Sequence, residues 1–246
     1  VTLGLVPAAF ANSGAPPSEG AAYKEVEVKN GGSVEGRVIL VGELPRPRVA
    51  VTGMHRRVCG SKPNWIDPLL IGDQMGVARA YVYLKRISKG KAWGKEFAMA
   101  PVMDQVKCLY EMKPKIVKGG AVITFKNSDP VAHQVRIRAG RKQLGGGGMA
   151  PGNKTLSIKT DKLTQENNSI HVYCPMHAAM AESYFVAWNP YFTSSGVRGE
   201  FKIDQIPPGE YELSVWHPGI DSKSVPVSIA TGKTARKDFA VLGRAR

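Results

Sequence analysis

The chain of 246 residues is predicted to be an all-β protein. Glycine and proline are both frequent, with 27 and 17 residues, and no long segment places apolar residues at helical spacing. Instead, short runs rich in β-branched and aromatic residues are separated by turn residues. These observations predict many short strands, and the length is sufficient for one large or two ordinary β domains.

The N-terminal stretch, residues 1–11, looks like the end of a secretory signal peptide. It is apolar and ends in Ala9-Phe10-Ala11, a small-x-small cleavage pattern. An ordinary N-terminal strand and an uncleaved membrane anchor are the alternatives. Residues 12–32, which begin with a stretch rich in Ala, Gly, Pro and Ser, are expected to form a flexible leader. A signal peptide implies a periplasmic or secreted protein.

Residues 33–103 are expected to contribute the first strands. Residues 34–42 form a β-branched run that ends at a glycine, and residues 80–85 combine aromatic and β-branched side chains. A shorter strand is expected within residues 48–52. The stretch 53–76 is rich in proline and glycine, which predicts a loop.

A second block of strands begins near residue 104. Its strands are expected at residues 115–118, 121–126, 133–138, 156–158, 170–173 and 184–188. In the third of these strands His133, Val135 and Ile137 share one face, and the residues between them are polar. This alternation places His133 at the inner end of a half-buried strand.

The last block is expected to form three or four antiparallel strands with hairpin-length connections. Its alternating runs lie at residues 200–203, 206–216, 225–229 and 237–242.

A set of possible metal ligands follows the strand at residues 170–173. Cys174, His177 and Met180 offer a thiolate, an imidazole and a thioether within seven residues, and His133 can supply a second imidazole. This donor set suits mononuclear copper in a trigonal site with a weak axial thioether. Met176 is the alternative thioether, but it lies between Cys174 and His177 and is expected to point away. Zinc would favour a further cysteine or histidine over a methionine.

The remaining two cysteines, Cys59 and Cys108, are expected to form a disulfide, because a secreted protein is exposed to an oxidising environment. Two buried free thiols are the alternative. The other histidines are not expected to bind the metal: His55 lies in a basic surface loop, His171 on a strand facing away from the site, and His217 in a turn.

No catalytic apparatus is visible in the sequence. There is no Ser/His/Asp or paired-carboxylate arrangement, and acidic residues are scarce near the metal loop. The glycines at 145–148 lack the Gly-Lys pair and the following helix of a phosphate-binding loop, so they predict a flexible connection. The protein is therefore not expected to be an enzyme.

The spacing Cys174-x-x-His177-x-x-Met180, with His133 in a strand after the turn at residues 127–130, resembles the cupredoxin family of blue-copper proteins. The resemblance covers roughly residues 104–190. It implies a Greek-key β-sandwich that holds one mononuclear type-1 copper ion. Gln134 departs from the family, which commonly has Asn there to fasten the strand to the cysteine loop.

A second resemblance concerns the flanking segments. Residues 199–203 and 207–213 read Gly-x-Phe-x-Ile and Pro-Pro-Gly-x-Tyr-x-Leu, a pattern that resembles a carboxypeptidase-regulatory-like β-sandwich, as do residues 34–42 and 78–85. The resemblance implies a small second sandwich and says almost nothing about function.

Together, the two resemblances suggest a copper domain at residues 104–192, placed between residues 33–103 and 193–246 of the second sandwich. The alternative is an N-terminal cupredoxin that includes residues 33–100, followed by a small C-terminal sandwich.

The resemblance to cupredoxins implies an extracytoplasmic electron-transfer protein that cycles copper between Cu(I) and Cu(II). The formal charge of +14 favours an acidic redox partner, such as a cytochrome or a larger electron-transfer complex, or an anionic membrane surface. Nucleic acid is not expected, because no basic stretch is interleaved with aromatic residues. Two alternatives stay open: copper storage or delivery, and a structural subunit of an extracytoplasmic complex with a vestigial cupredoxin module.

Overall fold

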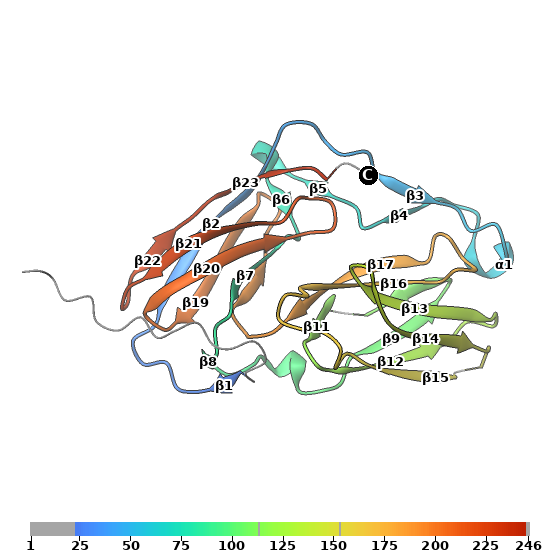
Figure 1. The fold of residues 1–246 in the computed structure, drawn as a ribbon. Coiled ribbons are helices and arrows are strands. Elements are labelled where there is room, and N and C mark those ends of the chain that lie inside the picture. The colour runs from blue at the N-terminus through green and yellow to red at the C-terminus, as the bar shows by residue number, and fades with distance from the viewer. Residues whose placement is uncertain (1–22, 113, 153, 245–246) are drawn as a thin grey trace, which may run out of the picture.

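The computed structural model describes residues 23–112, 114–152 and 154–244 and confirms the all-β class (Figure 1). The expected signal peptide, residues 1–11, and residues 12–22 of the expected leader lie outside the described residues. None of the helices in the described part of the chain reaches the length and apolarity that a membrane crossing requires.

Two β-sandwiches account for most of the strands. The first, here called the central sandwich, packs a four-stranded sheet of order β10-β9-β12-β15 against a five-stranded sheet of order β11-β17-β16-β13-β14. Its strands are β9 (Val102–Val106), β10 (Leu109–Glu111), β11 (Ile116–Lys118), β12 (Val122–Asn127), β13 (His133–Ala139), β14 (Lys142–Met149), β15 (Thr155–Lys159), β16 (Ser169–Tyr173) and β17 (Ala181–Ala187).

The alternation of side chains positions the core of the central sandwich. Ile123 and Phe125 on β12 face Val135 and Ile137 on β13 across the two sheets, and all four are fully buried. The residues between them point outward and are polar or half-exposed. His133, the first residue of β13, has the same parity as Val135 and is buried with them.

The glycine run at residues 145–148 is not the expected flexible connection: it belongs to β14 and pairs with β13. The physical reason is close packing against the other sheet. A Cβ atom on Gly145 would lie 2.9 Å from Cγ2 of Ile158, and one on Gly147 would lie 3.0 Å from Cδ2 of Leu156. Glycine therefore lets side chains from β15 occupy space that a larger residue on β14 would fill.

The second, here called the flanking sandwich, consists of a sheet of order β18-β7-β20-β21 and a sheet of order β19-β2-β22, with β23 also on β2. Its strands are β2 (Gly32–Val41), β7 (Tyr81–Lys85), β18 (Phe192–Ser194), β19 (Glu200–Ile206), β20 (Gly209–Trp216), β21 (Lys223–Ile229), β22 (Thr234–Arg236) and β23 (Phe239–Leu242). Contrary to the expected antiparallel set, β22 and β23 pair parallel to β2. The chain crosses from one sheet to the other after β21, so it returns in the direction of β2 and not as a hairpin.

An apolar contact joins the two sandwiches. Phe185 and Ala187 on the outer face of β17 pack with Trp216 of β20, together with half-buried aromatic residues from β7 and β18. The rings of Tyr81 and Phe185 stack with 4.7 Å between centroids. This contact fixes how the flanking sandwich sits against the five-stranded sheet.

Residues 44–66, here called the covering segment, leave the flanking sandwich after β2 and cross to the end of the central sandwich (Figure 1). The segment contains β3 (Arg48–Ala50), α1 (Arg56–Cys59) and β4 (Asn64–Ile66), and β3 pairs antiparallel with β4. The loop expected at residues 53–76 thus contains ordered elements. The other short elements are β1 (Lys24–Glu25), β5 (Leu70–Ile71), β6 (Val77–Ala78), β8 (Lys89–Gly90) and the 3-10 helices η1 (Asp73–Met75) and η2 (Lys95–Phe97).

Candidate metal centre

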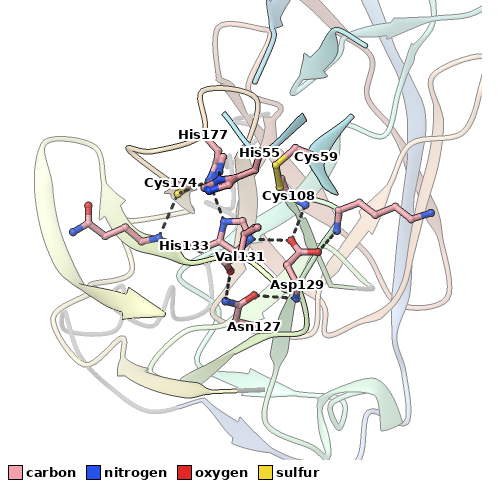
Figure 2. Close-up of a disulfide and its surroundings, with 11 residues drawn as sticks. His55, Cys59, Cys108, Asn127, Asp129, Val131, His133, Cys174 and His177 are labelled. Carbon is pink, nitrogen blue, oxygen red and sulfur yellow. Dashed lines mark hydrogen bonds and ion pairs between the residues drawn. A yellow bond between two sulfur atoms is a disulfide. The ribbon is translucent and has the colours of Figure 1, made fainter. Parts of the chain in front are cut away.

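Three of the four expected ligands, His133, Cys174 and His177, lie together at one end of the central sandwich (Figure 2). Their potential ligand atoms are all within 4.8 Å of one another, and all three residues are buried. The Nδ1 atoms of His133 and His177 are 3.1 Å apart, and Sγ of Cys174 is 3.5 Å from Nδ1 of His177. Atoms that bind one ion at about 2.0–2.3 Å lie within roughly 4.3 Å of each other, so the separations of 3.1 and 3.5 Å suit a single metal.

The turn before β13 sets the position of His133. The Nδ2 atom of Asn127 donates to the carbonyl oxygens of Val131 and Met149, at 2.9 and 3.1 Å, and its Oδ1 accepts the N–H of Asp129 at 3.0 Å. Asn127 is fully buried, so these bonds replace water for every polar atom of its amide. They hold the turn in one conformation and bring His133 to the mouth of the sandwich.

Asp129 holds the outer nitrogen of His133. Its Oδ2 lies 2.8 Å from Nε2 of His133, and both side chains are buried. The same carboxylate accepts the N–H groups of Lys107 and Cys108 at 2.6 and 2.8 Å. These two residues have positive φ angles of 51° and 57° and form the two-residue turn between β9 and β10.

Asp129 was missed as a site residue, since the sequence indicated only a turn at residues 127–130 and few acids near the loop. A carboxylate on the outer nitrogen of a metal-binding histidine fixes its tautomer and ring orientation. The sequence signal that could have identified Asp129 is its position four residues before His133.

The loop that carries the other ligands is closed by its own backbone. Cys174 N–H donates to the carbonyl of Met180 at 2.9 Å, and Met180 N–H donates to the carbonyl of His177 at 2.8 Å. Met180 is buried in the same core as Cys174, whereas Met176 is 38% exposed. The N–H of Gln134 donates to Sγ of Cys174 at 3.3 Å. The tie between strand and loop is therefore made by the backbone at position 134 and does not need an Asn side chain.

The environment shifts the pKa values of all three residues in the cluster. Burial raises the pKa of the Cys174 thiol, but hydrogen bonds from the His133 ring and from nearby backbone N–H groups outweigh it and leave the pKa lowered. Burial lowers the pKa of His133, whereas hydrogen bonds to Cys174 and Asp129 leave it raised overall. The pKa of His177 is lowered, first by burial and then by the neighbouring histidine rings. A thiolate and a neutral His177 are the forms that a metal requires.

His55 is part of the site, although the sequence placed it in a surface loop away from the metal. Its Nδ1 lies 3.1 Å from Nε2 of His177, and the rest of the residue is exposed. The covering segment brings it there, so no local sequence pattern could show this contact. The outer nitrogens of both cluster histidines therefore have partners, and both Nδ1 atoms face Cys174.

The disulfide expected between Cys59 and Cys108 is present, with 5.0 Å between the Cα atoms. It joins the end of α1 to the β9–β10 turn beside Asp129. Two other groups of close donor atoms combine these cysteines with His177, or Cys108 with Asp129 and His133. A bridged sulfur is not a thiolate, so these groups are weaker candidates. His171 contacts Ser183 at 3.1 Å and His217 accepts the N–H of Gly219, both outside the cluster.

Comparisons with known proteins give partial similarity. Residues 189–237, in the flanking sandwich, match the family model described as polysaccharide lyase family 4, domain II. No curated protein matches the chain.

Several solved structures that resemble part of the chain are amicyanin mutants. A reduced Cu(I) form at pH 4 is 25% identical and covers 36% of this chain and 82% of its own, with a TM-score of 0.30. An oxidized mutant is 22% identical and covers 39% and 90%, with a TM-score of 0.29. Similarity at this level assigns no function to the chain.

Proposed function

We propose that the central sandwich is a cupredoxin-like module that binds one mononuclear copper ion and serves in electron transfer. The observation that carries this proposal is the convergence of His133, Cys174 and His177, with both outer imidazole nitrogens already engaged. One soft sulfur and two imidazoles are donors that suit copper, and Met180 in the same buried loop is the proposed thioether ligand. When bound, copper supplies a one-electron couple between Cu(I) and Cu(II).

The chain around the site would hold the ligands in place in both oxidation states. Asp129 keeps the Nε2 proton of His133 and so leaves Nδ1 free as a ligand. The N–H of Gln134 supports the thiolate of Cys174. Because strand, turn and loop are all joined by buried hydrogen bonds, these side chains have little freedom to rearrange. A rigid ligand set is what electron transfer needs, whereas acid/base catalysis would need further groups. We therefore infer that the protein is not an enzyme.

The proposed setting is the periplasm or the extracellular space, and the disulfide supports it, because such bonds persist in oxidising compartments. The proposed partner is an acidic redox protein such as a cytochrome, because the formal charge of +14 attracts anionic surfaces and raises the rate of encounter.

The proposal is tested by loading the purified protein with Cu(II) and recording its visible absorption and paramagnetic resonance spectra. A thiolate bound to Cu(II) should give an intense blue band, and Cys174→Ser should abolish it. His171→Gln changes an imidazole outside the cluster and should keep the band. A colourless wild-type protein that does not retain copper would refute the proposal.

A further inference from the structure

The outermost part of the candidate site is His55, because His177 has no exposed surface. In the structure His177 is 0% exposed, and its outer nitrogen lies 3.1 Å from Nδ1 of His55. When Nδ1 of His177 binds a metal, Nε2 carries the proton of the neutral ring and can donate it to Nδ1 of His55. His55 is exposed and has a positive φ of 52°, a conformation that histidine adopts more readily than most residues.

The covering segment is anchored to the central sandwich at its middle and at its C-terminal end. The Cys59–Cys108 disulfide holds its middle, and Nδ2 of Asn64 donates to the carbonyl of Ala179 at 2.8 Å. Just beyond the segment, the carboxylate of Asp67 accepts the N–H and the hydroxyl of Ser183, both at 2.8 Å. A molecule that approaches this end of the sandwich therefore meets the covering segment and not His177.

The outer face of the covering segment is apolar at its centre. Val49 and Trp65 are paired across β3 and β4, so their side chains share one face of this ribbon. They are 47% and 57% exposed, and Met54, next to His55, is 49% exposed. The neighbouring residue Asn64 points to the opposite face, where it contacts the metal loop. The ribbon thus presents apolar side chains to solvent on the face opposite its contact with the metal loop.

The same segment carries positive charge alone. Residues 44–66 contain no aspartate or glutamate, and their charged side chains are all exposed cations: Arg46, Arg48, Arg56, Arg57 and Lys62. An apolar centre within a basic rim is complementary to a partner with the opposite arrangement of charge.

The geometry points to the covering segment as the docking face for the redox partner, with His55 as the residue of the site that the partner contacts. The partner is a redox protein whose own centre is ringed by carboxylates. This inference rests on the proposed function, and it places the contact on a segment that comes from outside the central sandwich.

The first experiment maps anion contact on the metal-free protein by NMR, with the inert paramagnetic trianion hexacyanochromate(III) as probe. Line broadening should concentrate on the amides of residues 54–62 at low salt. Arg56→Glu/Arg57→Glu should reduce this broadening by about tenfold or more. The matched control is Arg141→Glu/Lys142→Glu, a pair of exposed cations where the β13–β14 turn meets β14, at the other end of β13 from His133. Line broadening spread evenly over the basic surface would contradict the proposed docking face, and so would equal effects of the two double variants.

The second experiment concerns His55 itself and uses the copper-loaded protein with hexacyanoferrate(III), which accepts one electron from the reduced form without proton transfer. His55→Leu fills the same space without a ring nitrogen. It should keep the blue band and slow the reaction by about tenfold or more, the usual effect of losing a partner of a metal-bound histidine. An unchanged or faster reaction would show that His177 is reached directly. If His55→Leu loses copper, His55→Gln, which keeps an acceptor for His177, gives the same comparison. A wild type without a blue band would instead refute the proposed function and leave the NMR result standing.

Discussion

The Nε2 atom of His133 lies 2.8 Å from Oδ2 of Asp129, and this carboxylate also holds the backbone N–H of Cys108. One buried side chain therefore connects the candidate metal centre to the disulfide and to the turn between β9 and β10.

Replacing Asp129 should weaken copper binding without removing a ligand. In Asp129→Asn the amide cannot hold the Nε2 proton of His133 as a carboxylate does, so ring orientation and basicity are less well fixed. Affinity for copper should fall by about 10- to 100-fold, measured by competition with a chelator. Asp161→Asn, at an exposed carboxylate in the turn after β15, is the control and should leave affinity unchanged. Equal affinities in both variants would contradict the role of Asp129.

Copper affinity should fall as the pH is lowered, beginning above the ordinary histidine pKa of about 6.5. The metal needs a neutral His133, and the pKa of this ring is raised in the metal-free protein, so protons compete at a higher pH than usual. The pKa of His177 is lowered by burial and by the neighbouring histidine rings, so protons compete for this ring at a lower pH than for an ordinary histidine. Binding titrations between pH 5 and 8 test this, and Asp129→Asn should move the onset to lower pH. A flat profile over this range would be inconsistent with a raised pKa at His133.

The two methionines of the loop should differ in their effect on the copper spectrum. Met180→Leu should retain copper but change the absorption spectrum and the reduction potential, because a weak axial ligand tunes both. Met176→Leu, at a partly exposed position of the same loop, should leave both unchanged. The reverse result would assign the thioether to Met176.

Removing the disulfide should destabilise the protein. The bridge spans a sequence separation of 49 residues, and in the chain-entropy model a loop of this size corresponds to about 4 kcal/mol. Cys59→Ser/Cys108→Ser should lower the free energy of unfolding by this order, measured by urea denaturation. Wild-type protein measured in reductant is the control and should match the double variant. A variant as stable as oxidised wild type would mean that the covering segment is held by its other contacts alone.

The glycines of β14 should differ in their tolerance of side chains. Gly145→Val places a side chain against Ile158 and should cost about 1–3 kcal/mol through overpacking. Gly148→Val is the matched control, because none of the described residues outside its chain neighbours places an atom within 4 Å of a Cβ at this position. Urea denaturation of the two variants gives the comparison, and equal stabilities would show that the sheets can separate at no cost.

The sequence predicted those features that depend on local pattern. Alternation located β13 and placed His133 on its buried face, and the spacing of Cys174 and His177 brought both to one loop. The all-β class and the Cys59–Cys108 disulfide are confirmed. The choice of copper stays a prediction, because it depends on the donors and not on an observed ion.

The features that the sequence did not show depend on contacts between distant segments. His55 and His177 are 122 residues apart, and they meet only because the covering segment folds across the sandwich. Asp129 lies in an ordinary turn motif, and its role depends on hydrogen bonds to the backbone of the distant β9–β10 turn. The glycines of β14 were expected to form a flexible connection, but tight packing against Ile158 and Leu156 of β15 favours glycine in this strand.

The aromatic contact between Phe185, Tyr81 and Trp216 has a consequence for how the molecule would work in an assembly. Units joined by a flexible linker sample many orientations, whereas a buried apolar contact removes that freedom. If the flanking sandwich is attached to a larger body, the end of the molecule that carries His55 must point in one fixed direction from the attachment. The candidate metal centre would then keep one orientation relative to the point of attachment. Small-angle scattering of the protein should fit a single rigid particle.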